Sequence, residues 1–218
     1  MSTIAVVVGG GAVPRPQIDV DDLIAADSGL DRALEAGLSP TLLVGDLDSI
    51  SDDGLWWARE HGLRVEQHST DKDDTDTALA LRAAVATPHD RLLLLGPSSV
   101  DRLDHQLGTI VALGAPELAR LEAITAQLGD TVLHVLHPGH AVDLELAVGT
   151  TFSLLALHGT CTGIEMRGAR WPLSDAELQP GRTLGISNES VGGTVHVSVT
   201  DGVLTVVIPP VTATGVAA

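Results

Sequence analysis

Two short runs of aspartate stand out among the residues that could do chemistry. One is Gly-Asp-Leu-Asp-Ser at residues 45–49, and the other is Asp-Lys-Asp-Asp-Thr-Asp at residues 71–76. The four carboxylates of the second run repel one another at neutral pH unless a cation lies among them. Hard oxygen ligands of this kind suit Mg²⁺, which binds through a few carboxylates, waters and substrate phosphates. The two runs together predict a magnesium site for a phosphate-bearing substrate.

Each run also has an ordinary structural interpretation. Asp and Thr are favoured at helix N-termini, where acidic side chains interact well with the helix dipole. Taken alone, the run at 71–76 is more typical of a solvated helix cap, and the turn at 45–49 is evenly balanced between the two interpretations. Their joint appearance after two strands of one sheet favours the metal site.

The elements that must position these residues follow from the first half of the chain, where apolar runs alternate with helix-like stretches. Apolar runs separated by helices imply crossover connections and a parallel sheet, which binds ligands beyond the carboxyl ends of its strands. Asp27, Asp46 and Asp48 all follow predicted strands, and the last two project to the same side if the chain stays extended. The predicted strands cover residues 3–8, 23–26, 41–44, 63–67, 91–95 and 122–126, and the predicted helices cover 30–36, 52–61, 75–86 and 104–113.

The second half contains short runs rich in Val, Thr and Leu, with turn residues between them and no convincing helix. Asp201-Gly202 lies between two of these runs, which is a strong hairpin signal. We therefore expect an α/β domain at residues 1–128 and an all-β sandwich domain at residues 129–218. The predicted strands of the second domain cover residues 132–136, 142–146, 151–157, 184–187, 194–200 and 203–208.

Composition narrows the function further. The 218 residues are 44% hydrophobic and carry a formal net charge of −17, so this is a globular chain that repels nucleic acid and anionic membranes. Phosphate chemistry on such a chain needs a cation as intermediary. Cys161 is the only cysteine, which excludes an internal disulfide. The first residues lack the basic region of a signal peptide, so we expect a cytoplasmic protein.

Two further segments have the composition of anion-binding loops. Residues 96–105 follow a predicted strand, and their small residues and Arg102 suit a phosphate. By itself, an ordinary loop with Asp104 as the helix N-cap and Arg102 paired to a neighbouring carboxylate is the better interpretation. Gly9-Gly10-Gly11 is equally consistent with a plain turn and with a tight turn that a nucleotide approaches.

With these elements in order, the chain resembles the thiamine pyrophosphokinase family over nearly its whole length. The resemblance implies a nucleotide-binding α/β domain followed by a β-sandwich, assembled as a homodimer with the active site near the subunit interface. It also implies Mg²⁺-dependent transfer of the diphosphate of ATP to the hydroxyl of thiamine, which releases AMP. The matching stretches are ADSGLDRALEAGLSP (26–40), GDLDSI (45–50), DKDDTD (71–76), DRLDH (101–105), RGARWPL (167–173) and LGISNE (184–189).

The resemblance implies a role for each motif residue. Trp171, which precedes a proline in a polar setting, suits stacking on the thiazolium ring, although a Trp that covers the end of the sandwich is the alternative. Ser187 and Asn188 match the other thiamine-binding positions. The implied metal ligands are Asp46, Asp48 and Asp76, which are also catalytic together with Asp71, and the implied nucleotide-binding residues are Asp27, Asp73, Thr75, Arg102, Asp104 and His105.

The chain also departs from the family pattern. Val100 and Asp101 stand where the family usually has glycines, and Asp101 brings a negative charge close to the expected phosphates. Two alternative functions remain: a related diphosphokinase that acts on a hydroxymethylpterin, and a non-catalytic nucleotide or thiamine sensor. Trp171 with the Ser-Asn pair favours thiamine over a pterin, and the intact set of metal carboxylates favours an enzyme over a sensor.

Overall fold

A computed structural model describes residues 1–98 and 102–210 of the chain. The chain divides into two compact units, Met1–Gly129 and Asp130–Ala218, which are described separately below. Val100, Asp101 and the tail after Pro210 lie outside the described residues.

The first unit is built on six strands that all run parallel to their neighbours, in the order β6-β5-β1-β2-β3-β4. The chain adds β2, β3 and β4 on one side of β1 and then returns to its other side with β5 and β6. The strand order therefore reverses between β1 and β5, which is where open parallel sheets bind ligands. The strands are β1 (Thr3–Val7), β2 (Asp22–Ala26), β3 (Leu42–Gly45), β4 (Arg64–Gln67), β5 (Arg91–Gly96) and β6 (Ala123–Leu128).

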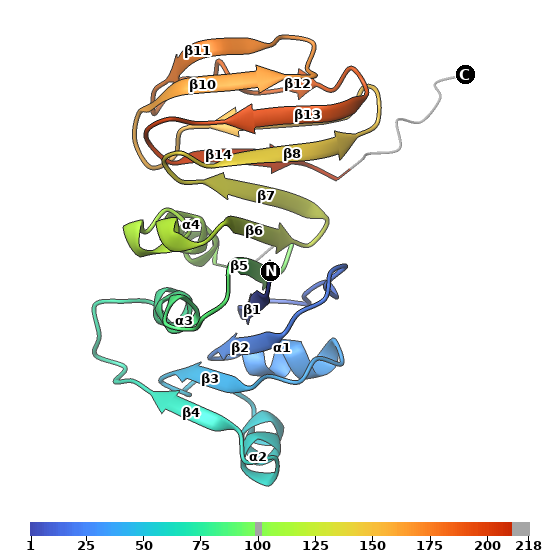
Figure 1. Ribbon diagram of the computed structural model, residues 1–218. Coiled ribbons are helices and arrows are strands. Elements are labelled where there is room, and N and C mark those ends of the chain that lie inside the picture. Colours follow the sequence, from blue (N-terminus) through green and yellow to red (C-terminus); the bar gives the residue numbers. More distant parts are fainter. Residues whose placement is uncertain (99–101, 211–218) are drawn as a thin grey trace. The chain divides into compact units, whose positions relative to one another are not determined.

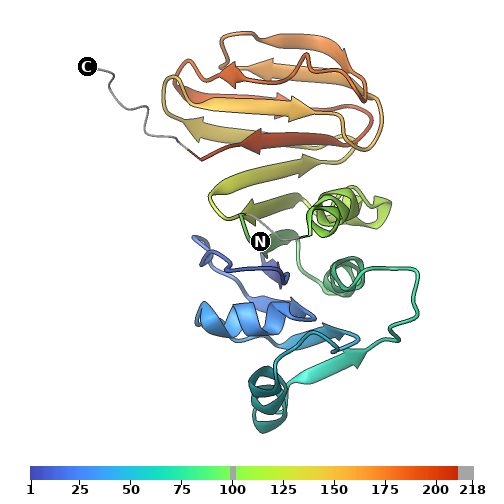
Figure 2. The same ribbon diagram turned by 180° about the vertical axis from the view of Figure 1, so that it is seen from behind.

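Helices cover both faces of this sheet (Figures 1 and 2). Helices α1 (Gly29–Glu35) and α2 (Asp52–Glu60) lie on one face, and α3 (Asp76–Val85) and α4 (Leu103–Ala112) lie on the other. Strand β1 is buried along its whole length because both of its faces are covered. The short 3₁₀ helix η1 (Pro116–Arg120) precedes β6. No helix in the two described ranges is long and apolar enough to cross a membrane.

The second unit contains only strands, as the sequence predicted. They form two antiparallel sheets, β12-β9-β14-β7 and β11-β10-β13-β8, which face each other across one apolar core. Phe152 and Val206 enter this core from the first sheet, and Ile164 and Val197 enter it from the second. The strands are β7 (Thr131–Leu136), β8 (Ala141–Leu146), β9 (Thr151–Leu155), β10 (Cys161–Arg167), β11 (Leu173–Leu178), β12 (Asn188–Glu189), β13 (Gly193–Ser198) and β14 (Leu204–Ile208).

The expected hairpin at Asp201-Gly202 is wrong. Strand β13 pairs with β8 and β10, whereas β14 pairs with β7 and β9, so the turn carries the chain from one sheet to the other. Asp201 instead forms a bridge with Thr162, at the start of β10. Strands β13 and β14 each have an apolar face. In the sandwich these two faces meet across the core, so the strands do not lie next to each other in one sheet.

Two other strand predictions for the second unit need correction. Residues 184–187 form a turn: Leu184 is 72% exposed, and Ser187 has a positive φ of 61° that an extended strand does not allow. Strands β10 and β11 were not predicted, because charged side chains such as Glu165 and Glu177 interrupt their apolar residues. In the structure, the buried residues of β10 largely alternate with half-buried ones, as expected for a strand with one face towards solvent.

Candidate functional site

Three carboxylates from different segments meet at the carboxyl edge of the parallel sheet. Asp27 follows β2, Asp46 follows β3, and Asp76 is the first residue of α3. One oxygen atom from each lies within 4.8 Å of the other two. Parallel pairing of Ala26 with Val44 brings the ends of β2 and β3 to the same edge, so the residues after them are neighbours. Chain segments far apart in sequence thus supply one cluster of hard oxygen ligands.

Asp27 is the most buried member of this cluster. Its residue is 8% exposed, and its backbone has a positive φ of 46°. Ser49 donates a hydrogen bond to Oδ2, while the buried Oδ1 has no hydrogen-bond partner among the described residues. A buried carboxylate oxygen without a partner is costly, and a cation is the partner that its charge requires. The donor set of three carboxylates therefore fits a hard divalent ion such as Mg²⁺.

Lys72 is a member of the site that we did not expect from the sequence. Its Nζ lies 2.6 Å from Asp46 Oδ2 and 3.1 Å from Asp76 Oδ1. Burial would lower the pKa of this ammonium group, but the hydrogen bonds and charges of the two carboxylates outweigh it and raise the pKa. The Lys72 hydrogen bond is also the main reason why the pKa of Asp46 is lowered. One signal was available: Lys72 is the only lysine in the chain.

Asp48 lies beside the group of three rather than in it. Its side chain is exposed, and its backbone N–H donates to Asp46 Oδ1 over 3.3 Å. The negative charge of Asp46 is the largest cause of the raised pKa of Asp48, followed by desolvation and by a hydrogen bond with Asp46; the charges of Asp27 and Asp76 add to these. Asp48 therefore lies close enough to all three carboxylates for their negative charges to raise its pKa.

The run at residues 71–76 divides between the site and the solvent. Asp71 and Asp73 are exposed and do not line the pocket described below. Asp74 forms an ion pair of 2.6 Å with Arg82 of α3. Thr75 is the N-cap of α3, since its Oγ1 accepts a hydrogen bond from Ala78 N over 3.2 Å. Both interpretations of this run are therefore correct, for different residues: Thr75 caps the helix, and Asp76 contributes to the carboxylate cluster.

Close backbone approach requires glycine at two positions around the cluster. Gly45 has a φ of 154°, and a Cβ there would lie 3.0 Å from Asp27 Cβ and 3.1 Å from Asp76 Oδ1. A Cβ on Gly29 would clash with the backbone carbonyl group of Val7. Any larger side chain would therefore push these segments apart.

Asp31 of α1 anchors the loop that carries Asp46. Its Oδ2 accepts a hydrogen bond from Ser51 N over 2.9 Å, and its Oδ1 accepts one from Ser51 Oγ over 2.6 Å. Ser51 is in turn the N-cap of α2, with Oγ 3.0 Å from Gly54 N. Within the loop, Leu47 has a φ of 71°, which is strained for a bulky residue and needs such external support.

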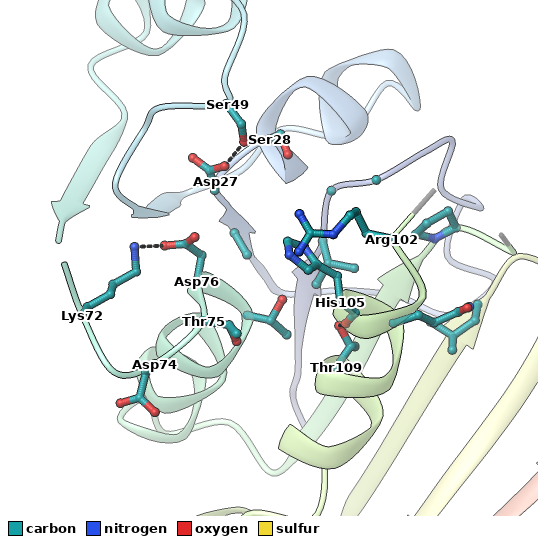
Figure 3. A pocket seen from close by; sticks show the side chains of 18 of the residues that line it. Asp27, Ser28, Ser49, Lys72, Asp74, Thr75, Asp76, Arg102, His105 and Thr109 are labelled. Atoms are coloured by element: carbon teal, nitrogen blue, oxygen red, sulfur yellow. Dashed lines mark hydrogen bonds and ion pairs between the residues drawn. The ribbon is translucent and has the colours of Figure 1, made fainter. Parts of the chain in front are cut away.

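A pocket of about 500 Å³ opens next to the carboxylates. This volume lies within the range of roughly 300–1,000 Å³ that is usual for small-ligand sites. Lys72 and Asp76 lie on one side of it, and Arg102 and His105 at the start of α4 lie across from them (Figure 3). The lining residues are Val8, Gly9, Gly10, Ala26, Asp27, Ser28, Ser49, Thr70, Lys72, Asp74, Thr75, Asp76, Thr77, Pro97, Arg102, His105, Gln106, Thr109 and Leu128.

Arg102 is paired with a carboxylate in the structure. Its Nε and a terminal nitrogen lie 3.0 and 2.6 Å from the two oxygens of Asp104. The Arg102 hydrogen bond is the main cause that lowers the pKa of Asp104 to about 2. Arg102, not Asp104, occupies the N-cap position of α4, so the expected Asp104 cap is wrong. Asp104 does not line the pocket, and Arg102 does.

In the second unit, Trp171 and Asn188 lie together. Asn188 Oδ1 accepts a hydrogen bond from Trp171 N over 3.2 Å, and its Nδ2 donates to Trp171 O over 2.8 Å. Asn188 is buried, so its amide fixes the backbone that carries the Trp171 ring, which is 52% exposed. The Arg170 guanidinium lies 4.8 Å from the centre of this ring and pairs with Glu189 over 2.9 Å. Ser187 is exposed next to them.

The sequence and fold of this chain match known proteins along most of its length. The catalytic domain of thiamin pyrophosphokinase matches residues 19–124, and the vitamin B1 binding domain of the same family matches residues 139–204. Thiamine pyrophosphokinase from Bacillus subtilis is 28% identical over 212 residues, which cover 94% of this chain and 97% of the relative.

Solved structures agree with these matches. The crystal structure of thiamine pyrophosphokinase from Bacillus subtilis superposes with a TM-score of 0.80 at 25% identity and covers 97% of this chain and 100% of that one. The structure from Geobacillus thermodenitrificans gives a TM-score of 0.78 at 26% identity, over 97% of this chain and 99% of that one. Two domain matches in the same order, with full-length structural similarity, leave one conclusion. The chain belongs to the thiamine pyrophosphokinase family.

Proposed function

We propose that this protein transfers the diphosphate of ATP to the primary hydroxyl of thiamine and releases AMP. The observation that carries the proposal is the convergence of Asp27, Asp46 and Asp76 beside a pocket whose opposite side holds Arg102 and His105. A polyphosphate with a divalent ion needs both anionic and cationic surroundings, and this pocket supplies them on opposite sides. Residues 1–128 are the proposed catalytic domain, and residues 129–218 are the proposed thiamine-binding and dimerisation domain.

The proposed metal ligands are Asp27, Asp46 and Asp76, with Asp48 next to them. Bound Mg²⁺ would neutralise the phosphate charge and hold the chain of phosphates in line for attack. Asp27 is added to the ligands expected from the family resemblance because it is buried and its Oδ1 has no hydrogen-bond partner among the described residues.

The protein's own contribution to the reaction is mainly positioning and charge stabilisation, as in other phosphoryl transfers. Thr75, Arg102 and His105 line the pocket and are proposed to hold the nucleotide. The thiamine oxygen forms a bond to the β-phosphorus, the bond from that phosphorus to the oxygen bridging to the α-phosphate breaks, and AMP leaves with this oxygen. A carboxylate of the run at 71–76, which includes Asp71 and Asp73, accepts the hydroxyl proton. Arg102 exchanges Asp104 for the migrating phosphate oxygens.

Thiamine is proposed to stack on Trp171, positioned by Asn188 and flanked by Ser187. Replacing Trp171 with alanine is expected to raise the KM for thiamine about tenfold, because a cation–π contact in a partly desolvated site contributes roughly 1–2 kcal/mol. The KM for ATP should stay within twofold. Trp56→Ala, which removes another exposed Trp, is the matched control and should change neither constant. Equal effects of the two variants would contradict the stacking role.

A homodimer is proposed because each unit exposes apolar side chains that a second copy would cover. On α4, Leu103, Leu107 and Val111 are 64%, 53% and 64% exposed at a spacing of four residues, so they form one stripe. In the second unit, Leu184 and Val191 are 72% and 57% exposed. Light scattering at micromolar concentration should give twice the mass of the chain, and Leu107→Glu is expected to shift it towards the monomer. A monomeric wild-type protein would contradict the dimer.

One assay tests the function itself. The protein is incubated with Mg·ATP and either thiamine or a hydroxymethylpterin, and nucleotide products are separated by chromatography. AMP and thiamine diphosphate in equal amounts are the expected products. AMP formed only with the pterin would support the alternative diphosphokinase, ADP would indicate transfer of a single phosphate, and the absence of turnover with either acceptor would support a sensor. The cytoplasmic location expected from the sequence remains a prediction.

A further inference from the structure

The ammonium group of Lys72 pairs with two of the three carboxylates that a metal ion would need. It lies 2.6 Å from Asp46 Oδ2 and 3.1 Å from Asp76 Oδ1, and these two residues are members of the group of three carboxylates. All three side chains are largely shielded, with 16%, 11% and 25% of Lys72, Asp46 and Asp76 exposed. An internal cation therefore neutralises part of the cluster.

This arrangement cannot persist once a divalent ion binds. A single ammonium group leaves Asp27 Oδ1 buried without a hydrogen-bond partner among the described residues, so it compensates the cluster incompletely. A divalent ion that binds the same carboxylates would repel the ammonium group at close range. Lys72 also lines the pocket, on a flexible four-carbon stem, across from Arg102 and His105 (Figure 3).

The composition of the chain supports a specific need for lysine here. Lys72 is the one lysine among 12 lysine and arginine residues, and it lies within the aspartate run. The planar guanidinium of arginine binds a carboxylate through two parallel hydrogen bonds and would be harder to displace. A lysine ammonium group is a compact point charge that can pair with a carboxylate and can also bind a phosphate.

We propose that Lys72 is a mobile counter-ion, which neutralises Asp46 and Asp76 in the metal-free protein and moves to the phosphates when metal and nucleotide bind. This inference rests on the proposed function. When metal binds alone, it must displace Lys72 from the two carboxylates, and the ammonium group gains no new partner. When metal binds together with nucleotide, the phosphates become the new partner of Lys72. Metal and nucleotide should therefore bind cooperatively, and Lys72 is the source of the coupling.

Mn²⁺ binding, followed by electron paramagnetic resonance, tests the proposal without catalysis. The wild type and Lys72→Met are titrated with Mn²⁺, with and without α,β-methylene-ATP, whose α–β linkage cannot be cleaved. In Lys72→Met the affinity of the free protein for Mn²⁺ is expected to rise about tenfold, and the gain in Mn²⁺ affinity caused by the nucleotide is expected to fall about tenfold. Arg82→Met is the control: it removes a nearby charge that pairs with Asp74, and should change the Mn²⁺ affinity by less than twofold.

A second measurement uses the wild type and so does not depend on the folding of a variant. Because Lys72 is the only lysine, the chain has one side-chain amine, and the α-amino group serves as an internal reference. Acetylation of Lys72 relative to that reference, followed by mass spectrometry, should rise several-fold with saturating Mg²⁺ and fall again when α,β-methylene-ATP is added.

The two measurements separate this inference from the proposed function. If the wild type forms thiamine diphosphate but Mn²⁺ affinity is unchanged or weaker in Lys72→Met, or metal leaves the acetylation of Lys72 unchanged, the counter-ion role is wrong and the enzymatic function stands. If the wild type neither binds Mn²⁺ with the nucleotide nor forms AMP, both proposals are wrong. A rise in affinity in Lys72→Met with loss of the nucleotide-dependent gain supports the role.

Discussion

Asp46→Asn is expected to lower the turnover number by about two to three orders of magnitude, the size of effect seen when a group that stabilises transition-state charge is removed. Asparagine keeps the shape of the side chain but loses the negative charge that a divalent ion requires. The variant should stay folded, because the lost ion pair with Lys72 at 2.6 Å is offset by weaker repulsion among the neighbouring carboxylates. The turnover number is measured as AMP release under saturating Mg·ATP and thiamine, and folding is followed by thermal melting.

Asp52→Asn is the matched control for this prediction. Asp52 is exposed in the first turn of α2, carries the same charge and lies on the same segment of chain, but it does not belong to the group of three carboxylates. The control should keep at least half of the wild-type rate. An Asp46→Asn enzyme as fast as this control would remove Asp46 from the metal site.

Asp27→Asn is expected to move activity and stability in opposite directions. Asparagine tolerates the positive φ of 46° and can still accept the Ser49 hydrogen bond, so the local structure should persist. Loss of the charge should lower kcat/KM and Mn²⁺ affinity by about two orders of magnitude. In the presence of a chelator, however, the variant should be more stable by about 1 kcal/mol, because a neutral amide replaces a buried carboxylate that lies close to the like charges of Asp46 and Asp76.

The stability of Asp27→Asn is measured by urea unfolding with and without a chelator and compared with Ser49→Ala. Ser49→Ala removes the hydroxyl that donates a hydrogen bond to Asp27 Oδ2 and keeps the charge. It should destabilise the protein by about 1 kcal/mol and lower activity by less than tenfold. If Asp27→Asn lost stability in the chelator and kept its activity, Asp27 would be a structural residue rather than a metal ligand.

Much of the first unit was predictable because its signals are local. Each predicted strand and helix there overlaps an observed one, since apolar runs and caps such as Ser51 and Thr75 depend on neighbouring residues. The second unit was less predictable. Strands β10 and β11 carry charged residues on their wet faces, and the partner of β14 depends on which apolar faces meet in the core.

The candidate site shows the same division. The order of the motifs was enough to indicate the family, and their position after β2 and β3 was enough to expect carboxylates at one edge of the sheet. Which oxygen atoms meet was not predictable, because this depends on strand register and side-chain direction. Asp27 therefore joins Asp46 and Asp76 in the group of three, whereas Asp48 is exposed beside it.

The sequence by itself determined the aspartate runs, the alternation of strands and helices in the first unit, the β-rich second unit and the likeness to thiamine pyrophosphokinases. The tertiary structure alone decided that Lys72 lies between Asp46 and Asp76, that Arg102 pairs with Asp104, and that residues 201–202 link two sheets. The physical reason is the distance along the sequence between the residues that interact. Strand alternation and helix caps are interactions between residues close in sequence, whereas the charge balance of the site is set by groups as far apart as Asp27 and Asp76, which only the folded chain brings together.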